Sequence, residues 1–127
     1  MTISVESLSS NQLKNHLTSI SQPCKRSHPV QNQLIVGMNN GKFPNNRNLK
    51  CYTNCVLEAA GIVSNGKINY RKTLRQIDVF FPREMKGPTK KALNICRSSV
   101  DGRDNCERSY SYIQCTYEQS NKHFFFP

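Results

Sequence analysis

The spacing of six cysteines constrains this chain more than any other feature. They follow the pattern Cys-x26-Cys-x3-Cys-x40-Cys-x9-Cys-x8-Cys within 127 residues. An even number of widely separated cysteines in a small chain indicates a disulfide framework, and persistent disulfides indicate secretion into an oxidising, extracellular environment. Six cysteines allow 15 pairings, so the spacing alone leaves the connectivity open. The cysteines are Cys24, Cys51, Cys55, Cys96, Cys106 and Cys115.

Length and composition predict one small domain that spans residues 1–127. Hydrophobic residues make up 36% of the chain and Trp is absent, so we expect a thin core that disulfides stabilise by roughly 3 kcal/mol each. The first residues, Met1 to Glu6, lack the features of a signal peptide, and we expect a mature form to which an initiator Met was added. No apolar run is long enough to span a bilayer, so we expect no membrane insertion.

The apolar residues recur at helical spacing almost throughout, which predicts an all-α fold of five to six short helices. Two Asn-Gly dipeptides, at Asn40 and Asn65, lack alternating apolar flanks, so we interpret both as turns that end helices rather than as hairpins. The predicted boundaries are a first helix starting after Ser9 or Ser10, a second from Pro29 to Asn39-Asn40-Gly41, a third ending at Gly61, a fourth ending at Pro82, a fifth opening at Pro88, and a sixth capped by Asp104 or Asn105.

Cys51 and Cys55 lie four residues apart and therefore share one face of the third helix. Each must reach a different helix, because a bond between them would strain the turn. A metal site would need a second cysteine pair or two close histidines, and the three histidines of the chain are scattered. An even cysteine count also argues against a free catalytic thiol. We therefore expect no metal, no cofactor and no enzyme activity.

The cysteine pattern resembles that of the six-cysteine insect odorant-binding proteins. That family has three residues between its second and third cysteines and eight between its fifth and sixth, as at Cys51/Cys55 and Cys106/Cys115. The segment Cys51-Tyr-Thr-Asn-Cys55-Val-Leu-Glu and the connector Gly61-Ile-Val-Ser-Asn-Gly66-Lys-Ile also resemble the family's third helix and following connector. The resemblance implies the pairing Cys24–Cys55, Cys51–Cys106 and Cys96–Cys115.

The resemblance also implies an internal apolar cavity that holds a small hydrophobic molecule for delivery to an olfactory receptor. Such a cavity needs apolar walls rather than reactive groups. Aliphatic residues at helical spacing more often pack against each other than line a cavity, so we expect about two thirds of the candidates to contact ligand. The candidate residues are Leu13, Leu17, Ile20, Leu74, Ile77, Phe81, Met85 (at the cavity mouth), Ala92, Leu93, Ile113, Tyr117, Phe124, Phe125 and Phe126.

The C-terminal residues 116–127 end in three consecutive phenylalanines, which would promote aggregation if exposed. We expect this tail to fold over and form part of the cavity wall, as in related proteins of similar tail length. The alternative is a disordered terminus. His123 lies beside the phenylalanines, and two interpretations stay open: a pH switch whose protonation loosens the tail, and a solvent-exposed histidine with no switching role. His16 is positioned to offer one hydrogen bond to a polar ligand group.

The net charge of +10 is more basic than we expect for this family. The basic residues are dispersed, without the aromatic platform that stacks bases, so we expect a solvated surface and no nucleic-acid partner. A cationic membrane-active defence protein and a non-olfactory secreted carrier are the alternative functions. A secreted phospholipase would need a His-Asp pair and a glycine-rich calcium loop, and neither occurs in the required arrangement. The oligomeric state is left open between a monomer and a weak homodimer.

Overall fold

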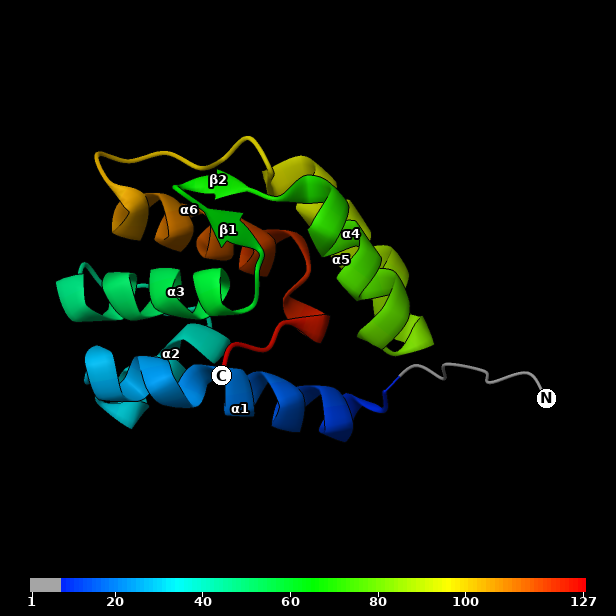
Figure 1. Cartoon of the computed structure of the whole chain (residues 1–127), viewed down its shortest axis with the longest axis horizontal. Coiled ribbons are helices and arrows are strands. Elements are labelled where there is room, and N and C mark those ends of the chain that lie inside the picture. The colour runs from blue at the N-terminus through cyan, green and yellow to red at the C-terminus, as the bar shows by residue number, and fades with distance from the viewer. Residues whose placement is uncertain (1–7) are drawn as a thin grey trace.

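The computed structural model describes residues 8–127, so the expectation for Met1 to Glu6 lies outside the described residues. The described chain contains six α-helices, one two-stranded hairpin and a short 3-10 helix (Figure 1), which confirms the predicted all-α class. The elements are α1 (Ser10–Ser27), α2 (Asn32–Asn39), α3 (Arg47–Ala59), β1 (Val63–Ser64), β2 (Lys67–Ile68), α4 (Tyr70–Phe80), α5 (Arg83–Cys96), α6 (Asn105–Gln119) and η1 (Asn121–His123).

Polar side chains cap the N-termini of α1, α3 and α6. The Ser9 side chain accepts a hydrogen bond from the Gln12 backbone at the start of α1, and Gln12 returns one to the Ser9 backbone as a capping box. Asn46 caps α3, and Asp104 caps α6 by accepting from the Glu107 N–H. Each cap satisfies a backbone donor that has no partner inside the helix. The predicted starts of α1 and α6 are therefore correct.

Two predicted helix starts at prolines were wrong. The second helix begins at Asn32 rather than Pro29, because the chain stays extended through Gln31 and Val30 packs against the core from this stretch. The fifth helix begins at Arg83, directly after Pro82, and Pro88 lies inside it. Gly87 precedes Pro88, and since glycine has no Cβ it avoids part of the steric conflict that normally ends a helix before proline.

The prediction for the two Asn-Gly dipeptides was correct at Asn40 and wrong at Asn65. Gly41 ends α2 with a φ of 84°, a left-handed conformation that glycine adopts without strain. Asn65 and Gly66, with φ of 51° and 73°, instead form the turn of the β1–β2 hairpin. Positive φ at both central residues matches the twist of two-residue hairpins. A single flanking pair, Val63 opposite Ile68, is sufficient apolar pattern here because it packs on the core.

The helices form a shell that three disulfides connect. In Figure 1, α3 lies between α1 and α6, and α4 and α5 stand together at the other end of the molecule. The disulfides are Cys24–Cys55, joining α1 to α3, Cys51–Cys106, joining α3 to α6, and Cys96–Cys115, joining α5 to α6. This is the pairing implied by the resemblance. Each of the two α3 cysteines bonds to a different helix, so α3 holds a fixed place at the centre of the shell.

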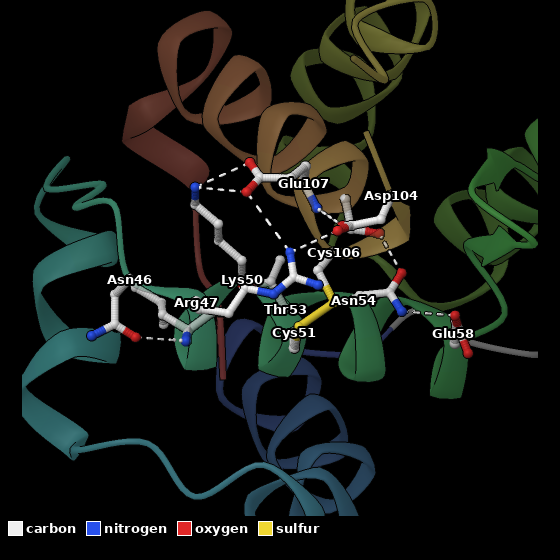
Figure 2. The surroundings of a disulfide bond; sticks show 12 residues. Asn46, Arg47, Lys50, Cys51, Thr53, Asn54, Glu58, Asp104, Cys106 and Glu107 are labelled. Carbon is white, nitrogen blue, oxygen red and sulfur yellow. Dashed lines mark hydrogen bonds and ion pairs between the residues drawn. A yellow bond between two sulfur atoms is a disulfide. The ribbon is translucent and has the colours of Figure 1, made fainter. Parts of the chain in front are cut away.

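An ion-pair network surrounds Cys51–Cys106 and reinforces the contact between α3 and α6 (Figure 2). The Lys50 ammonium is 3.0 Å from the Glu107 carboxylate and 2.6 Å from the Asn45 side-chain oxygen. Arg47 pairs with Asp104 at 2.8 Å. Burial of a lysine is destabilising unless its charge is paired and hydrogen-bonded, and Glu107 supplies that partner for Lys50. The network therefore fixes the register of α3 against α6.

Candidate ligand-binding site

Two adjoining apolar pockets lie between the helices and the C-terminal tail. The larger, here called the α1 pocket, has a volume of about 440 Å³ and is bounded by α1, α3, α4 and the last residues of the chain. The smaller, the α5 pocket, has a volume of about 140 Å³ and is bounded by α4, α5, α6 and the tail. Six residues line both pockets and form their common boundary. They are Leu57, Ile62, Gln76, Phe81, Ile113 and Phe125.

The tail is docked between the helices rather than extended into solvent. After η1 the chain passes from the end of α6 toward α1, where it ends in Figure 1. The side-chain amide of Asn39 donates to the Phe126 carbonyl at 2.9 Å, and its oxygen accepts from the Phe126 N–H at 2.8 Å. Tyr52 donates to the Pro127 carbonyl and its ring meets Phe126 edge-on, with centroids 6.1 Å apart. Phe126 is consequently buried, and Phe125 lies against both pockets.

Most of the residues selected from the sequence come together at these pockets. Met85 does not line either pocket. It lines a smaller neighbouring pocket together with Leu13, Lys14, Lys122 and His123. The predicted residues that line the α1 pocket are Leu13, Leu17, Ile20, Phe81, Ile113, Phe125 and Phe126. Those that line the α5 pocket are Ile77, Phe81, Ala92, Leu93, Ile113, Phe124 and Phe125.

Besides Met85, two predicted residues lie outside both pockets, namely Leu74 and Tyr117. Leu74 packs against the hydrophobic core, and α4 presents Thr73 and Gln76 to the pockets instead. The Tyr117 ring meets Phe43 and Phe124 edge-on, with centroid distances of 5.7 and 5.2 Å. It thereby supports the tail from behind rather than forming the pocket surface.

Several lining residues were not selected from the sequence. Leu57 lies in α3, and nothing in helical periodicity separates a residue that lines a pocket from one that fills the core. Ile62 lies in the connector before β1, where no periodic pattern exists. Thr73, Gln76, Tyr112 and Thr116 are polar or amphipathic, so a search restricted to apolar faces passed over them.

The polar side chains of the α5 pocket differ in whether their donors are used. Thr73 donates to the Asn69 carbonyl at 2.8 Å, Gln76 to Ala60 at 2.9 Å and Thr116 to Ile113 at 2.7 Å. The Tyr112 hydroxyl has no hydrogen-bond partner among residues 8–127, and burial raises the pKa of this phenol. His16, the residue selected for a polar contact, lies at the α1 pocket with its ring 5.7 Å from that of Phe80.

The described residues offer no arrangement for metal chemistry. All six cysteines are in disulfides. Across residues 8–127, no three side chains of His, Cys, Asp or Glu gather closely enough to hold an ion. In the same part of the chain, no helix combines the length and the apolar character needed to cross a bilayer. The linings of the two pockets are mainly apolar with a few polar side chains, which suits them to holding a molecule through apolar contact and a few hydrogen bonds.

Fold and pockets together define a small disulfide-linked helical protein of the insect odorant-binding type. Residues 6–119 match the model of the PBP/GOBP family, and the chain belongs to that family. General odorant-binding protein 72 of Anopheles gambiae is 33% identical over 122 residues, which cover 95% of this chain and 100% of that relative. General odorant-binding protein 19a of Drosophila melanogaster is 31% identical over 82% of this chain and 73% of the relative.

Solved structures give the same result for the fold. Odorant binding protein 5 of Apis mellifera superposes with a TM-score of 0.88 at 29% identity, covering 96% of this chain and 100% of that chain. Odorant binding protein 4 of Chrysopa pallens superposes with a TM-score of 0.87 at 27% identity, covering 94% and 99%. The six-cysteine resemblance found in the sequence is thereby confirmed.

Proposed function

We propose that this protein is an extracellular carrier that binds one small hydrophobic molecule in the joined α1 and α5 pockets. The observation that carries the proposal is the pair of adjoining pockets closed on one side by the docked tail. Relatives whose names describe odorant binding support the same class of ligand. In this proposal the chain acts as a single domain, residues 1–127, and has no catalytic role. Delivery of the cargo to an olfactory receptor is the final step.

The size of the pockets supports a ligand of odorant or pheromone dimensions. The α1 pocket alone falls within the roughly 300–1,000 Å³ that is typical of small-molecule sites. A ligand that buries about 300 Å² of apolar surface would gain about 7 kcal/mol before the cost of its lost translational freedom. We therefore expect micromolar dissociation constants. Binding at that strength suits a carrier that must also release its cargo.

A fluorescent-probe experiment tests the proposal directly. N-phenyl-1-naphthylamine is titrated into the protein and then displaced by alcohols, aldehydes, terpenoids and fatty acids. We expect saturable probe binding that Phe125→Ala weakens, because Phe125 lines both pockets. Tyr70→Ala is the matched control, since Tyr70 is also a half-buried aromatic residue but packs against Arg97 and lines neither pocket. Equal loss in both variants, or no saturable binding, would refute the carrier function.

Two alternatives make different predictions. A cationic membrane-active protein, suggested by the net charge of +10, would release dye from anionic vesicles, whereas a carrier with docked apolar residues leaves them intact. A non-olfactory carrier would bind ligand equally well but would be expressed outside sensory tissue. Transcript mapping therefore separates it from an odorant carrier, which we expect in the lymph around sensory neurons. Sedimentation of the free protein distinguishes a monomer from a weak homodimer.

A further inference from the structure

The Tyr112 side chain occupies an unusual place among the tyrosines of this protein. Tyr112 is only 5% exposed to solvent and lines the α5 pocket. Its hydroxyl has no hydrogen-bond partner within residues 8–127. By contrast, Tyr52 donates to the Pro127 carbonyl, Tyr110 donates to the Pro44 carbonyl at 2.8 Å, and Tyr70 donates to the Asn94 side chain. A fully buried phenol usually finds a hydrogen-bond partner, because an unpaired one is destabilising. Among residues 8–127 no fully buried side-chain oxygen or nitrogen lacks a partner, so the unpaired Tyr112 hydroxyl is accessible from the pocket. The Tyr112 hydroxyl is thus a free donor at a pocket wall.

The surroundings of Tyr112 decide what kind of group it can bind. The donors of Thr73, Gln76 and Thr116 are already directed to backbone carbonyls, whereas the hydroxyls of Thr89 and Ser120 also line the pocket and are on side chains less buried than Tyr112. In the described part of the chain, no Asp, Glu, Lys or Arg lines the α5 pocket, and His123 is the only other titratable side chain there. Burial raises the pKa of Tyr112, so the phenol keeps its proton and acts as a donor. The same desolvation disfavours a negatively charged ligand group at this position.

We propose that the Tyr112 hydroxyl donates a hydrogen bond to a neutral oxygen of the cargo, and so selects alcohols, aldehydes, ketones or esters over hydrocarbons and carboxylates. This inference rests on the proposed carrier function. The oxygen of the ligand lies in the α5 pocket, and its hydrocarbon part extends past the shared boundary into the larger α1 pocket, along Leu13, Leu17 and Ile20. Tyr112 is then the residue that determines specificity, while the aliphatic walls supply most of the affinity.

A matched ligand series on matched variants tests this role. Geraniol and citral carry an oxygen on similar ten-carbon skeletons, myrcene is the corresponding hydrocarbon, and geranic acid is the corresponding anion. Each displaces N-phenyl-1-naphthylamine from wild type, Tyr112→Phe and Tyr117→Phe. Tyr117 is the control because it is on the same helix but lines neither pocket.

In wild type, geraniol and citral should bind more tightly than myrcene by roughly five- to tenfold, the usual effect of one net hydrogen bond. Citral should share this advantage, because its aldehyde oxygen needs only to accept a hydrogen bond from the Tyr112 hydroxyl. Tyr112→Phe should bind myrcene normally and lose the preference for both oxygenated ligands, whereas Tyr117→Phe should behave as wild type.

If Tyr112→Phe still prefers geraniol and citral over myrcene, another side chain, such as Thr89, donates the hydrogen bond to the ligand oxygen. That result overturns the inference and leaves the carrier function standing. Geranic acid binding more tightly than geraniol overturns the neutral class of ligand. Failure of wild type to bind the probe removes the carrier function and the inference together. Should Tyr112→Phe not fold, the wild-type order of citral, geraniol and myrcene still decides, because equal affinities would exclude a hydrogen-bonding subsite.

Discussion

Asn39 should control how firmly the C-terminal tail closes the ligand site. Its side chain forms two hydrogen bonds to the backbone of Phe126, one as donor at 2.9 Å and one as acceptor at 2.8 Å. Phe126 is only 3% exposed, so in Asn39→Ala its N–H and carbonyl lose these partners without free access to water. We expect the substitution to shift the tail from docked toward undocked and thereby to weaken ligand binding.

The size of the effect follows from the two lost bonds. At about 1 kcal/mol of net stabilisation each, Asn39→Ala reduces the free energy of tail docking by about 2 kcal/mol. Each 1.4 kcal/mol is a factor of ten, so the docking equilibrium changes roughly 30-fold. Asn40→Ala is the control, since the Asn40 side chain bonds only to the exposed Val36 carbonyl and does not touch the tail. Its effect should stay within about 0.5 kcal/mol.

Amide hydrogen exchange measures this equilibrium at the tail itself. The Phe126 amide should exchange roughly 30-fold faster in Asn39→Ala than in Asn40→Ala, while core amides of α3 remain protected. Probe affinity should fall in the same variant, because the tail forms part of both pockets. Unchanged exchange at Phe126 together with unchanged affinity would refute the reasoning that these two hydrogen bonds hold the wall in place.

Three further predictions concern charged and titratable groups. Glu107→Gln should lower the free energy of unfolding by about 2 kcal/mol because it leaves the buried Lys50 without its ion pair, and adding Lys50→Met should recover most of the loss in urea denaturation. The pKa of Asp104 is lowered, chiefly by the hydrogen bond from the Glu107 backbone, so Asp104→Ala should destabilise the protein at neutral pH, with the difference from wild type vanishing as pH falls through that lowered pKa. Loss of ligand affinity between neutral and mildly acidic pH should be smaller in His123→Ala than in wild type; equal pH dependence in both would exclude His123 as a switch.

The sequence was sufficient for the fold because its strongest signals are local or covalent. Helical periodicity and the six cysteines predict the class, and Asp104 identifies the start of α6 by ordinary capping chemistry. The errors in the predicted helix ends and turns arose where a neighbouring residue alters the conformation that a proline or an Asn-Gly pair usually indicates. Gly87 allows the helix to continue through Pro88, and one buried pair beside Asn65 is enough for a hairpin.

The site was less accessible to sequence reasoning, because periodicity gives the buried face of a helix but not what that face meets. Leu74 and Thr73 are adjacent on α4, yet the leucine packs on the core and the threonine lines the pocket. Asn39 was predicted only as part of a helix-ending turn, and its contact with Phe126 joins residues 87 positions apart. The absence of a hydrogen-bond partner for the Tyr112 hydroxyl within residues 8–127 can be recognised only from the positions of the surrounding polar groups. Long-range packing of this kind leaves no local pattern.

Methyl NMR during a titration with geraniol tests the central claim most directly, because the chain contains isoleucines both inside and outside the proposed site. Ile77 and Ile113 are buried at the pockets, whereas Ile95 is 42% exposed on the outside of α5. The account predicts saturable shifts at Ile77 and Ile113 with Ile95 unchanged. Shifts confined to Ile95, or no saturable shift at the two buried isoleucines, would contradict it.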